Sequence, residues 1–130
     1  MLLGDVSILV IEDVNAMRAQ IKMLLKNFGF RKVAVCEDAA QASAILDTES
    51  FQLVLCDWHL GTVSGLEFLQ YVRTHATHKD LGFIMVTAEC TRDRVLDAIK
   101  SGVDDYLVKP LTPGQIQDKV YGVLLKRQVL

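Results

Sequence analysis

The stretch FQLVLCD, residues 51–57, decides the fold because it is a short apolar run that ends in a single acid. Within residues 51–56 apolar and polar side chains do not alternate, which is typical of a strand covered on both faces. Four similar runs flank it, at Ser7–Ile11, Lys32–Cys36, Gly82–Thr87 and Asp105–Val108. The sequence therefore predicts five strands of a buried sheet.

Five segments with a helical spacing of apolar residues follow these runs. Their predicted core stripes are Met17, Ile21, Leu24, Leu25 and Phe28; Ala42, Ile45 and Leu46; Leu66, Leu69 and Val72; Val95, Leu96 and Ile99; and Ile116, Val120, Val123 and Leu124. The start signals are Asp38 and Thr91 as N-caps, Ser64 with Glu67 as a capping box, and Thr112 with Pro113 and Gln115. Gly29 and Gly102 end two of the helices.

Strands that alternate with helices predict an α/β domain with a parallel sheet. Because crossovers between parallel strands are right-handed, few topologies remain. The natural choice is a doubly wound five-stranded sheet in the order 2-1-3-4-5, the flavodoxin-like (βα)5 arrangement. The length fits one domain, residues 1–130, with a core spanning about residues 5–127.

Composition and charge exclude several classes of protein. The net charge is −2, and the basic stripe that nucleic-acid binding requires is missing. No apolar stretch approaches the length of a membrane span, and the first residues lack the features of a signal peptide. These features predict a cytoplasmic protein with no membrane insertion and no direct nucleic-acid binding.

The cysteines and two of the histidines have ordinary structural explanations. Three cysteines without close spacing form neither a disulfide framework nor a metal-ligand pattern. Cys36 and Cys56 lie in apolar runs, which predicts buried, inert thiols, and Cys90 is expected to be more exposed. His75 and His78 lie in a polar connection and are predicted to be surface residues.

Charged and polar side chains gather where the predicted strands end. Glu12 and Asp13 follow the first strand, Asp57 ends the third, Thr87 ends the fourth and Lys109 follows the fifth. Open α/β sheets bind ligands beyond the carboxyl ends of their strands, so these side chains should converge. Each one alone has a structural explanation, such as a helix N-cap or a surface turn. Five at the ends of four strands favour a functional site.

The charges of this group indicate its chemistry. Two carboxylates about 4 Å apart repel by about 4 kcal/mol at an effective dielectric constant near 20, so the cluster requires raised pKa values, a cation or a metal. Lys109 can balance one charge, and Mg²⁺ suits the remainder because it binds through few carboxylates and keeps several waters. Phosphoryl transfer to a carboxylate needs this combination. The pattern predicts Asp57 as the nucleophile, Glu12 and Asp13 as metal ligands, and Lys109 and Thr87 as contacts of phosphoryl oxygens.

At these residues the chain resembles the CheY-like receiver domains of response regulators in two-component signalling. The resemblance covers nearly the whole chain and is carried by ILVIED (8–13), LVLCDW (53–58), GLE (65–67), MVTAE (85–89) and DYLVKP (105–110). It implies that Asp57 takes a phosphoryl group from a histidine kinase or a histidine phosphotransfer protein. It also implies that the chain is no enzyme beyond its own phosphorylation and dephosphorylation.

The resemblance further assigns a ligand set and a switch. Mg²⁺ would be bound by Asp13, Asp57 and the main-chain carbonyl of His59, with Glu12 acting through a water. Thr87 would hydrogen-bond the phosphoryl group, and Lys109 would pair with it, next to a cis peptide bond to Pro110. Tyr106 resembles the switch aromatic that turns inward as Thr87 moves. The fourth helix, fifth strand and fifth helix would then bind a downstream target protein.

Three departures from the family pattern are informative. Leu60 and Gly61 stand where the family usually has Met and Pro, which predicts a more mobile loop. His59 and Glu89 occupy two positions that tune dephosphorylation in this family. A direct pairing of these two side chains is a hypothesis.

Four alternatives stay open. An N-terminal receiver fragment of a multidomain regulator would have the same sequence pattern. A receiver-like interaction scaffold that is never phosphorylated is also possible, and only the intact set of five site residues argues against it. A phosphohydrolase would need a second acid-base aspartate where this chain has Trp58 and His59, and a capping insertion. A flavin-binding protein would need a Ser/Thr/Gly-rich loop where residues 12–15 read EDVN.

Overall fold

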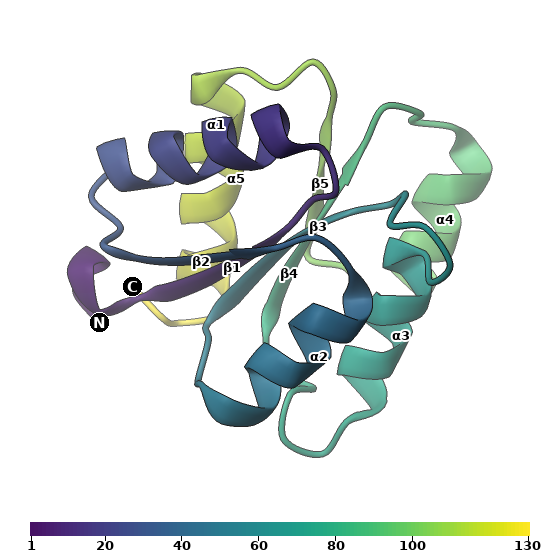
Figure 1. Ribbon diagram of the computed structural model, residues 1–130, viewed down its shortest axis with the longest axis horizontal. Coiled ribbons are helices and arrows are strands. Elements are labelled where there is room, and N and C mark those ends of the chain that lie inside the picture. The colour runs from purple at the N-terminus through teal and green to yellow at the C-terminus, as the bar shows by residue number, and fades with distance from the viewer.

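The apolar runs pair into one parallel sheet in the computed structural model, which describes residues 1–130 (Figure 1). The strands are β1 (Ser7–Ile11), β2 (Lys32–Cys36), β3 (Leu53–Asp57), β4 (Gly82–Thr87) and β5 (Asp105–Val108). They lie in the order β2-β1-β3-β4-β5, and every neighbouring pair is parallel. The predicted doubly wound topology is confirmed.

Helices cover both faces of the sheet. They are α1 (Asn15–Asn27), α2 (Ala39–Thr48), α3 (Gly65–Thr74), α4 (Arg92–Lys100) and α5 (Pro113–Lys126), with a short 3-10 turn at Leu3–Asp5. Helices α1 and α5 lie on one face, whereas α2, α3 and α4 lie on the other (Figure 1). None of these helices combines the length and the hydropathy needed to cross a membrane.

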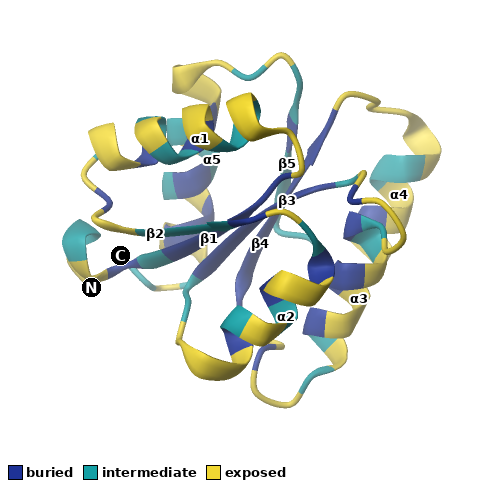
Figure 2. Cartoon of the chain, viewed as in Figure 1, coloured by how far each residue is buried: buried dark blue, intermediate teal, exposed yellow.

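Alternation along the strands divides the core into two layers. Ile8 and Val10 of β1 pack with the residues of α1 and α5, whereas Leu9 and Ile11 pack with those of α2 and α3. Figure 2 shows the resulting pattern, with buried strands between helices that expose one side. Both faces of the sheet are covered, which explains why the strands have no polar alternation.

The third strand differs from its predicted bounds. It begins at Leu53 and extends through Asp57, whereas the apolar run predicted residues 51–56. Asp57 stays within the ladder opposite Val86, and the N–H of Trp58 donates to the carbonyl of Val86 at 2.9 Å. The apolar run itself stops at Cys56, and Asp57 ends the strand as predicted. The pairing with β4 therefore fixes the backbone at Asp57 and at the residue that follows it.

Most helix signals are confirmed. The side chains of Asp38, Ser64, Thr91 and Thr112 each accept a hydrogen bond from the backbone N–H three residues later. Ser64 and Glu67 form the complete capping box, whereas at Thr112 only the hydroxyl half of the motif is present. Gly29 and Gly102 follow their helices at φ +109° and +91°, a region in which residues with a Cβ are strained.

Helix α4 contradicts its predicted core stripe. Leu96 and Ile99 are exposed by 41% and 58%, and Ala98 is the only buried residue of the helix. The apolar spacing therefore predicted the helix correctly but selected the wrong buried face. A helix held by one small buried side chain has little apolar contact with the body of the protein.

The predicted thiols and histidines have mixed outcomes. Cys36 and Cys56 are buried and Cys90 is exposed, as expected. Burial raises the pKa of the Cys36 thiol to about 11 and raises that of Cys56 well above its ordinary value, so both are inert at neutral pH. The prediction that His78 is a surface residue is wrong. His78 is only 8% exposed, and its ring stacks on that of His75.

Candidate functional site

Side chains from neighbouring strands converge at the carboxyl end of the sheet. Glu12 and Asp13 follow β1, and Asp57 ends β3. One carboxylate oxygen from each of these three residues lies within 4.8 Å of the others. Glu12 and Asp57 are 1% and 4% exposed, whereas Asp13 is exposed to solvent. The structure thus brings together the three acids that the sequence singled out.

Lys109 supplies the positive charge of the site. Its Nζ lies 2.6 Å from Oδ2 of Asp57 and 3.0 Å from Oε1 of Glu12. Burial lowers the pKa of this lysine, but hydrogen bonds and charges from Asp57 and Glu12 outweigh burial and raise it above its ordinary value. The ammonium group is therefore charged and shared by two buried carboxylates. The peptide bond from Lys109 to Pro110 is cis.

The backbone around Asp57 is tightly packed. The N–H of His59 donates to Oδ1 of Asp57 at 2.9 Å, and the N–H of Gly65 donates to the carbonyl of Trp58 at 2.8 Å. Gly65 begins α3, and a Cβ added there would overlap the carbonyl oxygen of Asp57. Glycine at position 65 thus allows α3 to start directly against the end of β3.

The pKa of Glu12 is shifted strongly from its ordinary value. Its side chain is buried, and burial together with a hydrogen bond and the charge of Asp57 raises the pKa of Glu12 to about 7, against the opposing effect of Lys109. The single lysine therefore does not outweigh burial and the effects of Asp57 on Glu12. The three carboxylates fit a hard divalent cation such as Mg²⁺, and the exposed carboxylate of Asp13 gives the cluster an open side.

In metal-free buffer the stability of the fold should fall as the pH rises. The folded-state pKa of Glu12, about 7, lies above its ordinary value of 4.5, so in this interval the folded protein keeps a proton that the unfolded chain has released. The free energy of unfolding should therefore decrease by about 2 kcal/mol between about pH 5 and about pH 8. Urea unfolding at several pH values, in the presence of a chelator, measures this decrease in the free energy of unfolding.

The matched variant is Glu12→Gln, which cannot ionise and should lose this part of the pH dependence. Other groups titrate in the same interval, so the difference between the two pH profiles is the informative quantity. Parallel profiles for the native protein and the variant would contradict the raised pKa of Glu12.

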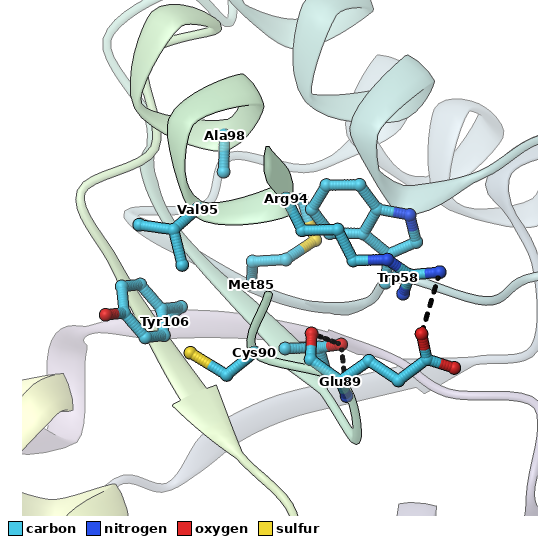
Figure 3. Close-up of a pocket in the computed structure, with 9 residues that line it drawn as sticks. Trp58, Met85, Glu89, Cys90, Arg94, Val95, Ala98 and Tyr106 are labelled. Carbon is cyan, nitrogen blue, oxygen red and sulfur yellow. Dashed lines mark hydrogen bonds and ion pairs between the residues drawn. The ribbon is translucent and has the colours of Figure 1, made fainter. Parts of the chain in front are cut away.

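Thr87 ends β4, next to β3, and Tyr106 lies within β5. The hydroxyl of Thr87 donates to the carbonyl of Glu89 at 3.0 Å and accepts from the N–H of Glu89 at 3.0 Å, so it is engaged with its own loop. Thr87 and Tyr106 also line a mainly apolar pocket between β4, β5 and α4. In Figure 3 the hydroxyl of Tyr106 points away from the other labelled side chains. The half-buried ring thus borders apolar side chains of α4, Val95 and Ala98.

Arg94 is a residue of the site that the sequence analysis missed. No hydrogen bond joins His59 to Glu89; instead Arg94 lies 3.2 Å from Nε2 of His59 and 3.4 Å from Oε2 of Glu89. Its guanidinium also stacks over the ring of Trp58 at 5.1 Å (Figure 3). An arginine seven residues after Thr87 carries no motif signal, so only coordinates could identify this bridge.

Comparisons with known proteins agree with this geometry. The chain matches the family described as the response regulator receiver domain over residues 8–121. It is 35% identical over 113 residues to the chemotaxis protein CheY of Pseudomonas aeruginosa, covering 87% of this chain and 91% of that protein. It is 31% identical over 116 residues to the chemotaxis protein CheY-3 of Vibrio cholerae, covering 89% of each.

Solved structures give the same result for the fold. A CheY-like response regulator receiver domain protein from Methanospirillum hungatei has a TM-score of 0.87 at 25% identity, with 95% of this chain and 96% of that chain covered. The chemotaxis response regulator CheY4 of Vibrio cholerae has a TM-score of 0.85 at 24% identity, with 92% and 98% covered.

Proposed function

The chain belongs to the response-regulator receiver family, and from that premise we propose that it is a signalling module switched by phosphorylation of Asp57. The observation that carries the proposal is the position of Asp57, a carboxylate only 4% exposed and bonded to Lys109 at 2.6 Å, among two further acids. The donor would be a histidine kinase or a histidine phosphotransfer protein, in the cytoplasm. The family is not one of classical enzymes, and the proposed chemistry is confined to the chain's own aspartate.

The proposed transfer uses residues that the site already holds in place. An oxygen of Asp57 attacks the phosphorus of the donor's phosphohistidine, the phosphorus–nitrogen bond breaks, and the imidazole leaves with a proton. Lys109 neutralises a phosphoryl oxygen after leaving Asp57, and Thr87 donates its hydroxyl to another. The N–H of His59, which now donates to Oδ1 of Asp57 at 2.9 Å, keeps the carboxylate oriented.

Receiver domains generally bind Mg²⁺ at an acidic pocket, and the donor set of this chain fits that ion. Asp13, Asp57 and the main-chain carbonyl of His59 would hold it, with Glu12 acting through a water. When bound, Mg²⁺ supplies positive charge for the phosphoryl oxygens. With Lys109, it would offset the part of the rise in the Glu12 pKa that comes from the charge of Asp57, although burial is the larger cause.

The proposed output involves α4, β5 and α5. Tyr106 would turn into the apolar pocket beside Val95 and Ala98 when Thr87 moves toward the phosphoryl group. Leu96 and Ile99, exposed on α4, give this face apolar side chains for a target protein. The weak anchoring of α4 supports its movement between two positions.

Incubation with Mg²⁺ and a small acyl-phosphate donor tests the proposal. Intact-mass spectrometry should show a gain of one phosphoryl group, and peptide mapping should place it on the segment that contains Asp57. The gain should disappear in excess chelator, because the acidic cluster repels the donor without a divalent ion. No gain would leave the non-phosphorylated scaffold as the better function, and a gain independent of Mg²⁺ would contradict the proposed role of the divalent ion.

A further inference from the structure

We propose that Arg94 is a positioning residue that holds His59 at the entrance to Asp57 and thereby slows hydrolysis of the phosphorylated aspartate. This inference rests on the proposed function and extends it to the lifetime of the phosphorylated state. It starts from the contacts of one guanidinium group, which lies within 3.4 Å of Nε2 of His59 and of Oε2 of Glu89 and stacks on Trp58 at 5.1 Å.

The position of Arg94 within α4 is not explained by helix stability. Thr91 is the N-cap, so Arg94 is the third residue of the helix, and its backbone N–H donates to the Thr91 hydroxyl at 3.3 Å. The positive end of the helix dipole lies here and disfavours a cation. The side chain is nevertheless only 24% exposed, because it lies across Trp58 and between His59 and Glu89. Its ordering comes from the residues that border Asp57.

The contact with Arg94 fixes the chemistry of the His59 ring. A guanidinium has only donors, so Nε2 of His59 can meet it only as an acceptor. While this contact lasts, Nε2 cannot accept a hydrogen bond from a water molecule. The backbone N–H of the same residue donates to Asp57 at 2.9 Å, so the residue that carries the held imidazole is anchored directly beside the phosphorylation site.

This arrangement affects the reaction that ends the signal. In hydrolysis a water oxygen attacks the phosphorus, the bond from phosphorus to the Asp57 oxygen breaks, and inorganic phosphate leaves as the water gives up a proton. With Arg94 in place, Nε2 of His59 is occupied and the ring stays fixed. Without Arg94, the ring can turn and Nε2 is free to accept a hydrogen bond that positions the attacking water, so hydrolysis accelerates.

The experiment follows the decay of the phosphorylated protein. The intact chain is phosphorylated with Mg²⁺ and an acyl-phosphate donor, desalted to remove the donor, and sampled by intact-mass spectrometry. Arg94→Ala should lose its phosphoryl group about two- to fivefold faster than the native protein, the range that an exposed ionic contact supplies. Arg94→Lys keeps the charge without the planar fork and should decay at an intermediate rate.

Two controls separate positioning from a general structural effect. Arg92 lies two residues earlier on α4, is exposed and makes no hydrogen bond or ion pair, so Arg92→Ala should decay at the native rate. In the His59→Ala background, Arg94→Ala should cause no further acceleration, because its effect acts through the imidazole. The unfolding midpoints of the Arg94 variants should stay close to the native value.

Each other outcome has a defined meaning. Unchanged or slower decay in Arg94→Ala overturns the inference, as does equal acceleration in Arg92→Ala or acceleration that persists without His59. In those cases the native protein still gains a phosphoryl group and the proposed function stands. If the native protein gains none, the proposed function fails and the role of Arg94 fails with it.

Discussion

Asp57→Asn should take up no phosphoryl group from an acyl-phosphate donor, although it should remain folded. The amide that replaces the carboxylate is a poor nucleophile. Asp57 ends its strand and is bonded to Lys109 at 2.6 Å, and no other acid of the site has this position, so none should take its place. The mass gain seen with the native protein should therefore be absent. Asp47→Asn removes an acid whose side chain is 62% exposed, and it should leave the gain unchanged.

The same variant should change the electrostatics of the cluster in a measurable way. A hydrogen bond and the charge of Asp57 are among the causes that raise the pKa of Glu12 to about 7, after burial itself. Without that charge the pKa of Glu12 should move toward its ordinary value, while Lys109 keeps its contact with Glu12 at 3.0 Å. In a chelator, the unfolding free energy of Asp57→Asn should therefore depend less on pH than that of the native protein. A mass gain in this variant, or an unchanged pH profile, would contradict the assigned role.

Gly65→Ala should damage both the fold and the site. A Cβ at this position would overlap the carbonyl oxygen of Asp57 and lie 3.0 Å from Sδ of Met85, so the first turn of α3 and the end of β3 must separate. Overpacking of this kind costs about 1–3 kcal/mol of unfolding free energy. Because the displaced atom belongs to the backbone of Asp57, phosphoryl uptake should slow as well. Urea unfolding and the rate of mass gain measure the two effects.

Gly114→Ala is the matched control for this prediction. Gly114 lies in the first turn of α5, as Gly65 lies in the first turn of α3, but no atom stands within 4 Å of its added Cβ. Alanine at position 114 should therefore stabilise the helix by about 0.5–1 kcal/mol and leave phosphoryl uptake unchanged. Similar losses in the two variants would show that helix propensity, and not the contact with Asp57, explains the requirement for glycine.

The sequence was sufficient to predict those features that depend on local effects of the residues themselves. Apolar runs predicted four of the strands with their observed bounds, and short polar residues before helices predicted the caps, because both effects are local. The convergence of Glu12, Asp13 and Asp57 was also predictable, since parallel strands place their carboxyl ends along one edge of the sheet.

Features that depend on distant partners were not predictable in this way. The spacing of Leu96 and Ile99 indicated a buried face for α4, but burial depends on where the helix packs, and only Ala98 is fully buried. His78 lies in a polar segment, but it is buried where that segment meets Leu46 and Phe51 around one pocket. Arg94 has one partner nearby in the sequence, Glu89, but it meets His59 from the loop after β3, 35 residues earlier in the chain.

The single buried residue of α4 has an evolutionary consequence. Most side chains of this helix contribute little to folding, so substitutions on its outer surface should accumulate at little cost in stability. Partner recognition could then diverge among descendants of this chain while the phosphoryl chemistry, anchored in the rigid strands, stays unaltered. Helix α4 buries the least, so it is the part of the molecule in which substitutions can accumulate with the least loss of stability.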